Sequence, residues 1–304
     1  MTTSKPKFSI LIVTYNSAEY ITGCLQSIIS QNFSDIEIVV VDNFSKDDTG
    51  SIVKSKFPQV KYFQNSANLG FAKAVNESMK HLNGKYILLL NPDLIVGKDF
   101  FYRIYNLLKD KGEIDILGVK LLEENGEVQP SSWKKISLLT VLTEMLLPYQ
   151  ISKKLVTIVP KNFSEVENVS GACMLIRKEV FHSLNGFDEN FFLYYEEIDF
   201  CRRAKKLGYK IFYIPDIEAI HFGSKSTSND RQIFFENLYK NKLYFIKKHF
   251  GKLFYATSYF IVITGILLRI IFGFIFGFVF FNRNLIRISQ SLILVLIKLI
   301  KNNA

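Results

Sequence analysis

Residues 8–121 alternate short apolar runs with amphipathic stretches, and this alternation constrains the fold more than any other feature of the chain. It is typical of a mostly parallel sheet with covering helices, an α/β fold. No GxGxxG motif follows the first run, so a dinucleotide-binding fold is not indicated. The expected strands are 8–14, 36–42, 60–64, 86–91 and 114–121, with helices between them and a further short strand entering a helix within 168–181.

The composition fits one sizeable core, or a catalytic domain with an appendage, since 48% of the 304 residues are hydrophobic and 22% are charged. Three cysteines, an odd number without metal-binding spacing, favour a reducing compartment. The first apolar run, 8–15, is too short and too soon followed by polar residues for a secretory signal. The catalytic part is therefore expected in the cytoplasm.

The positive charge belongs to the end of the chain. Residues 202–304 hold 17 of the 38 Lys and Arg residues and four of the 28 Asp and Glu residues, which leaves residues 1–201 with a net charge of −3. This distribution favours an anionic membrane surface over nucleic acid as the partner. A basic helix that is merely solvated is the alternative.

Two apolar stretches follow in this basic part. The first, 253–281, has Arg269 as its only charge and is long enough to cross a hydrocarbon core of ~30 Å. The second, 285–301, is interrupted by Arg287 and Lys298. Because Arg269 would cost a few kcal/mol near the centre of a simple span, a helical pair lying in the membrane plane is an open alternative.

Polar residues gather where the expected strands end, which is where open α/β sheets bind ligands. Asp42 suits a ribose hydroxyl or a base N–H, although a turn or cap is the alternative. Asn68 and Gly70 precede a helix expected to begin near Phe71, whose N–H groups suit a diphosphate. Asp93, after the most apolar run, suits Mg²⁺ or Mn²⁺ bridging phosphate oxygens.

The stretch FFLYYEEIDFCRR, residues 191–203, is rich in carboxylates and aromatic rings. On a helix Glu196 and Asp199 share a face, whereas Glu197 points about 100° away from Glu196. Only one or two of these acids can therefore reach a single site. An acidic first helical turn without catalytic meaning is the alternative.

Together these motifs resemble the inverting family-2 glycosyltransferases, within them the rhamnosyltransferase-like branch that builds bacterial surface polysaccharides. The resemblance covers about residues 8–225 and implies a GT-A fold, Rossmann-like, followed by hydrophobic membrane-associated helices. Its elements, in the family's order, are SILIVTYN, VVVDN, NLGFAKAVN, LLLNPD, GACMLIRKEVF, GFDENFFLYYEEIDFCRRAKKLGY and IHFGSKS.

The resemblance also implies a division of the chain. Residues 1–225 would form the catalytic domain, with a nucleotide-sugar half at 1–121 and an acceptor half at 122–225. A basic helical connector would follow at 226–252, and the hydrophobic helices at 253–304.

Site roles follow from the resemblance residue by residue. Glu197 would be the catalytic base, with Glu196 left as its competitor and Asp199 orienting. Asp93 and His221 would bind the divalent metal, Mg²⁺ or Mn²⁺, although Asn91 replaces the first Asp of the family's Asp-x-Asp pattern. By the resemblance, the donor side would comprise Thr14, Asp42, Asn68, Gly70, Asn91 and Arg203. Tyr15 and Asn16 join it because they follow the first expected strand, and Trp133, Gly171 and Ala172 are expected on the acceptor side from their own stretches of sequence.

The implied reaction is a single in-line displacement that moves a sugar, with dTDP-rhamnose favoured as donor, onto a hydroxyl of a lipid-linked glycan at the cytoplasmic face of a bacterial membrane. A catalytically idle, membrane-bound scaffold is the alternative. Nucleotidyl transfer is disfavoured, because TYNSAEY stands where such enzymes carry a glycine-rich basic loop.

Overall fold

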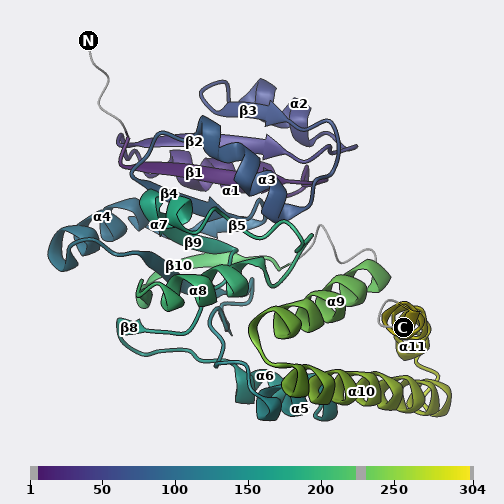
Figure 1. The fold of residues 1–304 in the computed structure, drawn as a ribbon. Coiled ribbons are helices and arrows are strands. Elements are labelled where there is room, and N and C mark those ends of the chain that lie inside the picture. Colours follow the sequence, from purple (N-terminus) through teal and green to yellow (C-terminus); the bar gives the residue numbers. More distant parts are fainter. Residues whose placement is uncertain (1–5, 224–230, 302–304) are drawn as a thin grey trace. The chain divides into compact units, whose positions relative to one another are not determined.

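The computed structural model describes residues 6–223 and 231–301 (Figure 1). The chain divides into two compact units, so the expected domain border at 225/226 lies outside the described residues. Unit 1 comprises Met1–Trp133, Ile158–Phe192 and Glu196–Ser226. Unit 2 comprises Lys134–Thr157, Leu193–Tyr195 and Thr227–Ala304.

Unit 1 is built on a ten-stranded sheet that contains all five expected strands. Its strands are β1 (Phe8–Thr14), β2 (Ile36–Asp42), β3 (Lys61–Gln64), β4 (Tyr86–Leu90), β5 (Leu94–Val96), β6 (Ile116–Leu122), β7 (Val128–Gln129), β8 (Ser164–Glu165), β9 (Cys173–Arg177) and β10 (Ile211–His221). Their order is β3-β2-β1-β4-β9-β6-β10-β5, with β7 paired to β6 and β8 to β10.

The sheet is parallel in its first half and mixed in its second. Strands β3, β2, β1 and β4 run parallel, whereas β9 lies antiparallel between β4 and β6. The expected α/β architecture is confirmed. The direction of β9 was not predicted, because the apolar pattern of a strand does not encode which way it runs.

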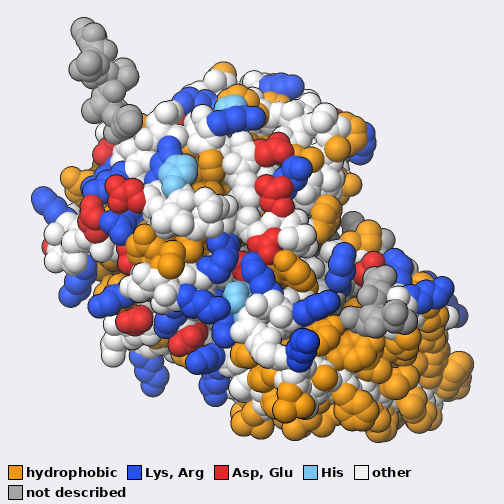
Figure 2. Space-filling model, viewed as in Figure 1, with side chains coloured by type: hydrophobic (Ala, Val, Ile, Leu, Met, Phe, Trp, Pro, Cys, Tyr) orange, Lys and Arg blue, Asp and Glu red, His pale blue; other side chains and the backbone are white. Residues whose placement is uncertain are grey.

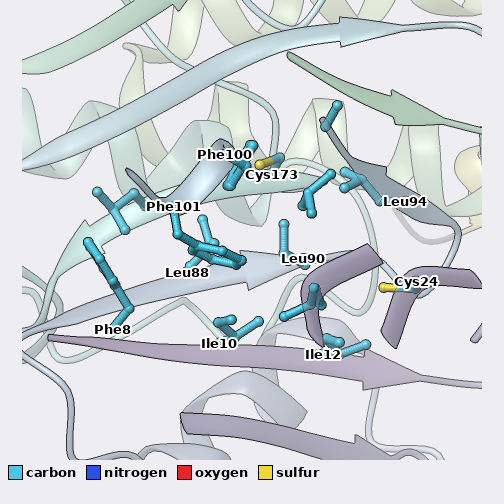
Figure 3. Close-up of a cluster of buried hydrophobic side chains, with 14 of the residues drawn as sticks. Phe8, Ile10, Ile12, Cys24, Leu88, Leu90, Leu94, Phe100, Phe101 and Cys173 are labelled. Carbon is cyan, nitrogen blue, oxygen red and sulfur yellow. The ribbon is translucent and has the colours of Figure 1, made fainter. Parts of the chain in front are cut away.

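Both faces of the sheet are covered, which explains why the central strands are continuously apolar. On β1, Phe8, Ile10 and Ile12 belong to one core (Figure 3), and Leu11 and Val13 to the other. The first core includes residues of α1 (Ile21–Ile29), α2 (Thr49–Lys56) and α4 (Phe100–Lys111). The second includes residues of α3 (Phe71–Ser78), α7 (Lys178–Ser183) and α8 (Glu196–Lys206). A 3₁₀ turn, Met79–His81, follows α3.

Unit 2 is helical. Its helices are α5 (Leu138–Leu146), α6 (Tyr149–Val156), α9 (Arg231–His249), α10 (Lys252–Val279) and α11 (Arg283–Lys301). Within the described ranges, α10 alone is long and apolar enough to cross a membrane by length and composition. Helices α10 and α11 form an antiparallel hairpin, in which Gly273 faces Ser289 and Gly277 faces Ile286.

Residues 134–157 group with unit 2 by their contacts. The sequence analysis expected them within the acceptor half, 122–225, and that functional division stays a prediction. Met145 of α5 lies against Gly265 of α10, where an added Cβ would stand 2.7 Å from the Met145 Cβ. The amphipathic helix α5 thus buries its apolar face against a helix more than a hundred residues away, which its own sequence does not reveal.

Candidate active site

Side chains from neighbouring strands meet at the carboxyl-terminal edge of the parallel half of the sheet. Thr14 of β1 is the register partner of Asp42 of β2. Asn91 directly follows β4, which pairs with β1 on its other side. The predicted donor-side residues on these three strands therefore lie along one edge, at the position where open α/β sheets bind ligands.

The three residues around the end of β1 differ in their surroundings. Thr14 is fully buried, and its Oγ1 has no hydrogen-bond partner within the described part of the chain. Tyr15 is exposed, and the Oδ1 of Asn16 accepts a 2.8 Å hydrogen bond from the Lys46 N–H. A buried hydroxyl without a partner is costly, so Thr14 is the residue of the three that a ligand would best satisfy.

Asp42 is buried and its carboxylate already has protein partners. Oδ1 accepts from the Ser45 N–H at 2.9 Å, and Oδ2 accepts from the Tyr62 hydroxyl at 2.7 Å. A carboxylate offers about four acceptor positions. A nucleotide contact to Asp42 would therefore use the positions that these two bonds leave open.

Asn43 was not predicted as a site residue, yet it organises the loop that contains Asn68 and Gly70, called the donor loop below because both were predicted on the donor side. Its Nδ2 donates to Asn68 Oδ1 at 2.9 Å and to the Gly70 carbonyl at 3.2 Å. Its Oδ1 accepts from the Leu69 N–H at 3.0 Å. The amide at the end of VVVDN thus holds the loop in place, and Asn68 acts within the same network.

Gly70 brings the donor loop against the segment that leads to the acidic helix. Its φ is +78°, and a Cβ there would stand 2.6 Å from the carbonyl oxygen of Phe192. The next residue, Phe71, donates its N–H to that same oxygen at 2.8 Å. Only glycine meets both the positive φ and the close approach at this position.

The segment Asn91–Asp93 lies beside the predicted acceptor-side residues. The Asn91 N–H donates to the Ala172 carbonyl at 2.9 Å, because β4 and β9 run antiparallel and pair Leu90 with Cys173. Gly171 and Ala172 are therefore placed at the same edge as the candidate metal ligand Asp93.

Asp93 and His221, the two predicted metal ligands, are brought together from opposite ends of the sequence. The Asp93 Oδ1 lies 3.4 Å from the His221 Nε2, and both residues are buried. Nδ1 of His221 lies 2.7 Å from the Gln129 Oε1. The Gln129 oxygen can accept a hydrogen bond from Nδ1, while Nε2 on the other side of the ring lies 3.2 Å from the Asn91 Nδ2.

These residues fit a divalent cation that takes most of its ligands from the substrate. The Asp93 Oδ2 is buried and has no partner among the residues described, and the imidazole of His221 lies next to the same carboxylate. Across residues 6–223 and 231–301, no three His, Cys, Asp or Glu side chains are grouped to hold a metal alone. Gln129, which orients the His221 ring, was missed because it lies in a two-residue strand without a motif.

The adjacent acids at the start of α8 have different environments. Glu196 is buried, and its Oε2 has no hydrogen-bond partner within the described residues. Burial, together with the nearby charge of Glu197, raises the pKa of Glu196 well above its ordinary value. Burial therefore favours the uncharged form of the Glu196 carboxyl over the charged form.

Glu197 points toward the strand-end residues. A Cβ added at Gly171 would lie 3.5 Å from the Glu197 Cβ and 3.9 Å from the ring of Phe71. Glu197 thus lies between the entry to β9 and the first residue of α3. Both acids sit next to an unusual backbone, since Tyr194 and Tyr195 have φ values of 71° and 74°, which non-glycine residues adopt rarely and at some cost.

Trp133 is tied to the same region through its backbone. Its N–H donates to the Asn168 Oδ1 at 2.9 Å, and the Asn168 Nδ2 donates to its carbonyl at 3.2 Å. Ser170 in turn donates its N–H to the Ser131 carbonyl. Trp133 therefore belongs to the strand-like pair of segments that leads to Gly171.

Asp199 and Arg203 form a separate arrangement. Asp199 is fully buried and accepts a 2.6 Å bond from the Arg203 Nε. The other guanidinium nitrogens donate to the carbonyls of Leu184 and Gly186, at 2.7 and 2.8 Å. These contacts position α8 against the loop before it and use three of the five N–H donors of the Arg203 guanidinium.

The first half of the sheet and β9 lie in a segment of the chain that matches a known protein family. The family model of glycosyl transferase family 2 matches residues 9–184. The chain belongs to this family. As a family-2 glycosyltransferase it carries the predicted donor-side residues up to Asp93, and Gly171 with Ala172, inside the matched segment, whereas the acids of α8 and His221 lie beyond it.

Two relatives agree with this assignment. The N-acetylglucosaminyl-diphospho-decaprenol L-rhamnosyltransferase of Mycobacterium tuberculosis is 25% identical over 239 residues, which are 73% of this chain and 78% of that protein. The rhamnosyltransferase WbbL of Escherichia coli is 26% identical over 246 residues, or 76% of this chain and 88% of that protein. The rhamnosyltransferase-like resemblance of this family-2 chain is thereby confirmed.

A solved structure gives the fold. The mannosyltransferase PcManGT of Pyrobaculum calidifontis, in complex with GDP-Man and Mn²⁺, matches with a TM-score of 0.59 at 15% identity and covers 99% of this chain and 89% of that chain. At this identity the likeness concerns the fold alone. The family-2 glycosyltransferase has the expected GT-A type of α/β sheet.

Proposed function

We propose that this glycosyltransferase moves a sugar from a nucleoside diphosphate onto a hydroxyl of a lipid-linked glycan, with inversion at the anomeric carbon. The observation that supports the proposal is that two buried polar groups without partners follow or end neighbouring strands at one edge of the sheet. The Oδ2 of Asp93 and the Oγ1 of Thr14 both lack partners among the described side chains and backbone. Such groups are expected where a polar ligand binds.

The proton in this reaction is assigned to Glu197. As the acceptor oxygen forms its bond to the anomeric carbon, the hydroxyl proton passes to the Glu197 carboxylate. The bond from that carbon to the diphosphate oxygen breaks, and its electron pair leaves with the nucleoside diphosphate. General-base help of this kind contributes about 10²–10⁴-fold. Burial of Glu196 disfavours its charged form, which supports the choice of Glu197 over Glu196 as the base.

Asp93 and His221 are the residues that would hold a divalent cation, with the diphosphate and water completing its shell. The bound cation would supply positive charge to the departing diphosphate. Asn91 contributes an amide and not a charged ligand, so the protein offers a single carboxylate. PcManGT, with GDP-Man and Mn²⁺, supports the choice of cation.

The relatives guide the choice of donor and acceptor. The mycobacterial relative is named for L-rhamnose transfer onto a decaprenol-linked sugar, which supports dTDP-rhamnose as first donor and a polyprenyl diphosphate-linked sugar as first acceptor. A lipid-linked acceptor would place the enzyme at a membrane, on its cytoplasmic face in a bacterium. The apolar helix α10 supports that location.

The experiment measures donor binding and turnover together. Detergent-purified protein is screened by thermal shift and donor hydrolysis against UDP-, dTDP- and GDP-sugars, with Mg²⁺, Mn²⁺ or EDTA. The Asp93→Ala variant is compared with Asp110→Ala, which removes an exposed carboxylate of α4. We expect stabilisation by one donor and cation pair in the wild type and in Asp110→Ala, and loss of it in Asp93→Ala.

Two outcomes would contradict the proposal. If no nucleotide sugar shifts the melting temperature, the chain is a scaffold without donor chemistry. If donor binds but nuclear magnetic resonance of the product shows retained anomeric configuration, the single displacement is wrong.

A further inference from the structure

Unit 2 exposes many large apolar side chains on several helices. Figure 2 shows them as one continuous region over α10 and the neighbouring α5 and α6. On α10 the exposed residues include Phe260, Ile271 and Phe278, at 70%, 51% and 65% exposure. Helices α5 and α6 add Leu139, Leu146 and Tyr149. An exposed apolar region of this extent marks an interaction surface.

The opposite side of α10 is occupied by protein along most of its length. Gly265 faces Met145 of α5, and Gly277 faces Ile286 of α11, where an added Cβ would lie 2.7 Å from side-chain atoms in each case. Buried α10 residues run from Ser258 to Gly277, about 29 Å along a helix. Helix α10 therefore has one lipid-compatible side and one protein side.

The charged residue in the middle of α10 is bound to polar groups of neighbouring helices. Arg269 donates to the Tyr239 hydroxyl of α9 at 2.9 Å and to the Glu144 carbonyl of α5. The Glu144 carboxylate forms an ion pair with Lys242 of α9. If α10 crossed a bilayer, Arg269 and these attached charges would stand near its centre, where each charge costs several kcal/mol.

A second ion pair argues against a membrane-spanning position of α11 as well. Lys298 lies 2.6 Å from Glu236 of α9, and its side chain is half exposed. Helix α11 also carries Arg287 and Lys301 on a short apolar stretch. A helix with this charge distribution fits an interfacial position better than a span.

The charge of unit 2 suits an anionic lipid surface. Unit 2 holds 15 Lys and Arg residues and three Asp and Glu residues, a formal charge of +12, whereas the rest of the chain carries −2 of the total of +10. Basic residues near an anionic bilayer contribute about 1 kcal/mol each. The chemistry therefore points to a bilayer as the partner, and not to a second protein.

We propose that unit 2 is a platform that lies in the plane of one leaflet of an anionic membrane. In this arrangement α5, α6, α10 and α11 insert their exposed apolar side chains, and α10 does not cross the bilayer. The proposal deepens the membrane location in the proposed function and does not depend on sugar transfer.

Depth measurements separate the two arrangements. Single cysteines replace Phe260, Ile271 or Phe278, which are spaced to lie on one line along α10, and carry nitroxide labels; the native cysteines are buried. Protein is bound to vesicles of phosphatidylglycerol and phosphatidylcholine, and oxygen and nickel-chelate accessibility give each depth. We expect three equal, shallow depths. A deep label at 271 with shallower labels at 260 and 278 would overturn the proposal.

Vesicle flotation tests the contribution of α5. The Leu139→Gln/Leu146→Gln variant is expected to lower the vesicle partition coefficient about tenfold or more. The control Leu207→Gln changes an exposed leucine of unit 1 and is expected to bind as the wild type does. Unchanged flotation of the double variant would remove α5 from the platform. Neither the depth measurement nor the flotation measurement uses a nucleotide-sugar donor. A failure of the proposed transferase activity would therefore not change how either measurement is interpreted.

Discussion

The Arg203 guanidinium donates from Nε to the Asp199 Oδ2 at 2.6 Å, one turn away on the same helix. The same group reaches the carbonyls of Leu184 and Gly186. A fully buried aspartate is thus neutralised by an arginine that also fastens α8 to the preceding loop. This contact fixes the position of the start of α8, where Glu196 and Glu197 lie.

Breaking this pair should destabilise the fold. We expect Asp199→Asn and Arg203→Ala each to lower the free energy of unfolding by about 2–4 kcal/mol, because each removes the ion pair and leaves the other charge without its partner. Urea unfolding of both single variants and the double variant checks this. The double variant should lose less than the sum of the two, and strict additivity would show that the pair is not coupled.

Substitutions of Glu197 and of Glu196 should lower kcat to different extents. We expect Glu197→Gln to lower kcat about 10²–10⁴-fold with donor affinity nearly unchanged, because the amide cannot accept the acceptor proton. Glu196→Gln should stay within about tenfold of wild type, since a protonated carboxyl and an amide are similar donors. Steady-state kinetics and donor titration measure both. Equal losses of kcat in the two variants would mean that Glu196 remains a candidate for the catalytic base.

Glu196 should also make the stability of the folded protein depend on pH. Its pKa is raised in the folded protein, so the folded state binds a proton that the unfolded state releases above about pH 4.3. The stability associated with the protonated carboxyl is complete below that pH and is lost as pH rises toward the folded pKa. Melting curves from pH 4 to 8 should therefore show Glu196→Gln gaining on wild type as pH rises. A constant difference would contradict the raised pKa.

Gly70 offers a test with a matched control. Gly70 and Gly126 have similar φ values of +78° and +83°, but an added Cβ meets the Phe192 carbonyl at Gly70 and nothing within 4 Å at Gly126. Gly126→Ala should cost about 1–2 kcal/mol for the backbone alone. Gly70→Ala should cost more and weaken donor binding, measured by denaturant unfolding and thermal shift. Equal costs would mean that Phe192 moves aside freely.

The sequence predicted those parts of the fold that depend on local pattern. The strands of the first half follow from apolar runs buried on both faces, and the positions of Asp42 and Asp93 follow from where those runs end. Asp93 and His221 were paired only through the family resemblance. Their separation of 128 positions in the chain becomes a short contact because β5 and β10 are neighbours.

Other features depend on tertiary burial, which local pattern does not carry. Glu196 and Glu197 are chemically identical in the sequence, and the surroundings of α8 alone distinguish them. Asn43 and Gln129 act through hydrogen bonds to distant residues, and neither stands out by type. The sequence around α5 indicated no partner for this helix, and its contacts with Gly265 and Arg269 group it with α10.

The place of β9 in the sheet has a consequence for how this protein is made. Strand β4 is five residues long and wholly apolar, and its second edge stays open until Cys173–Arg177 has been synthesised. Such an edge is a template for wrong pairing. A chain that ends at residue 121 therefore lacks the strand that covers this edge of β4, and during synthesis the edge precedes its partner strand by more than eighty residues.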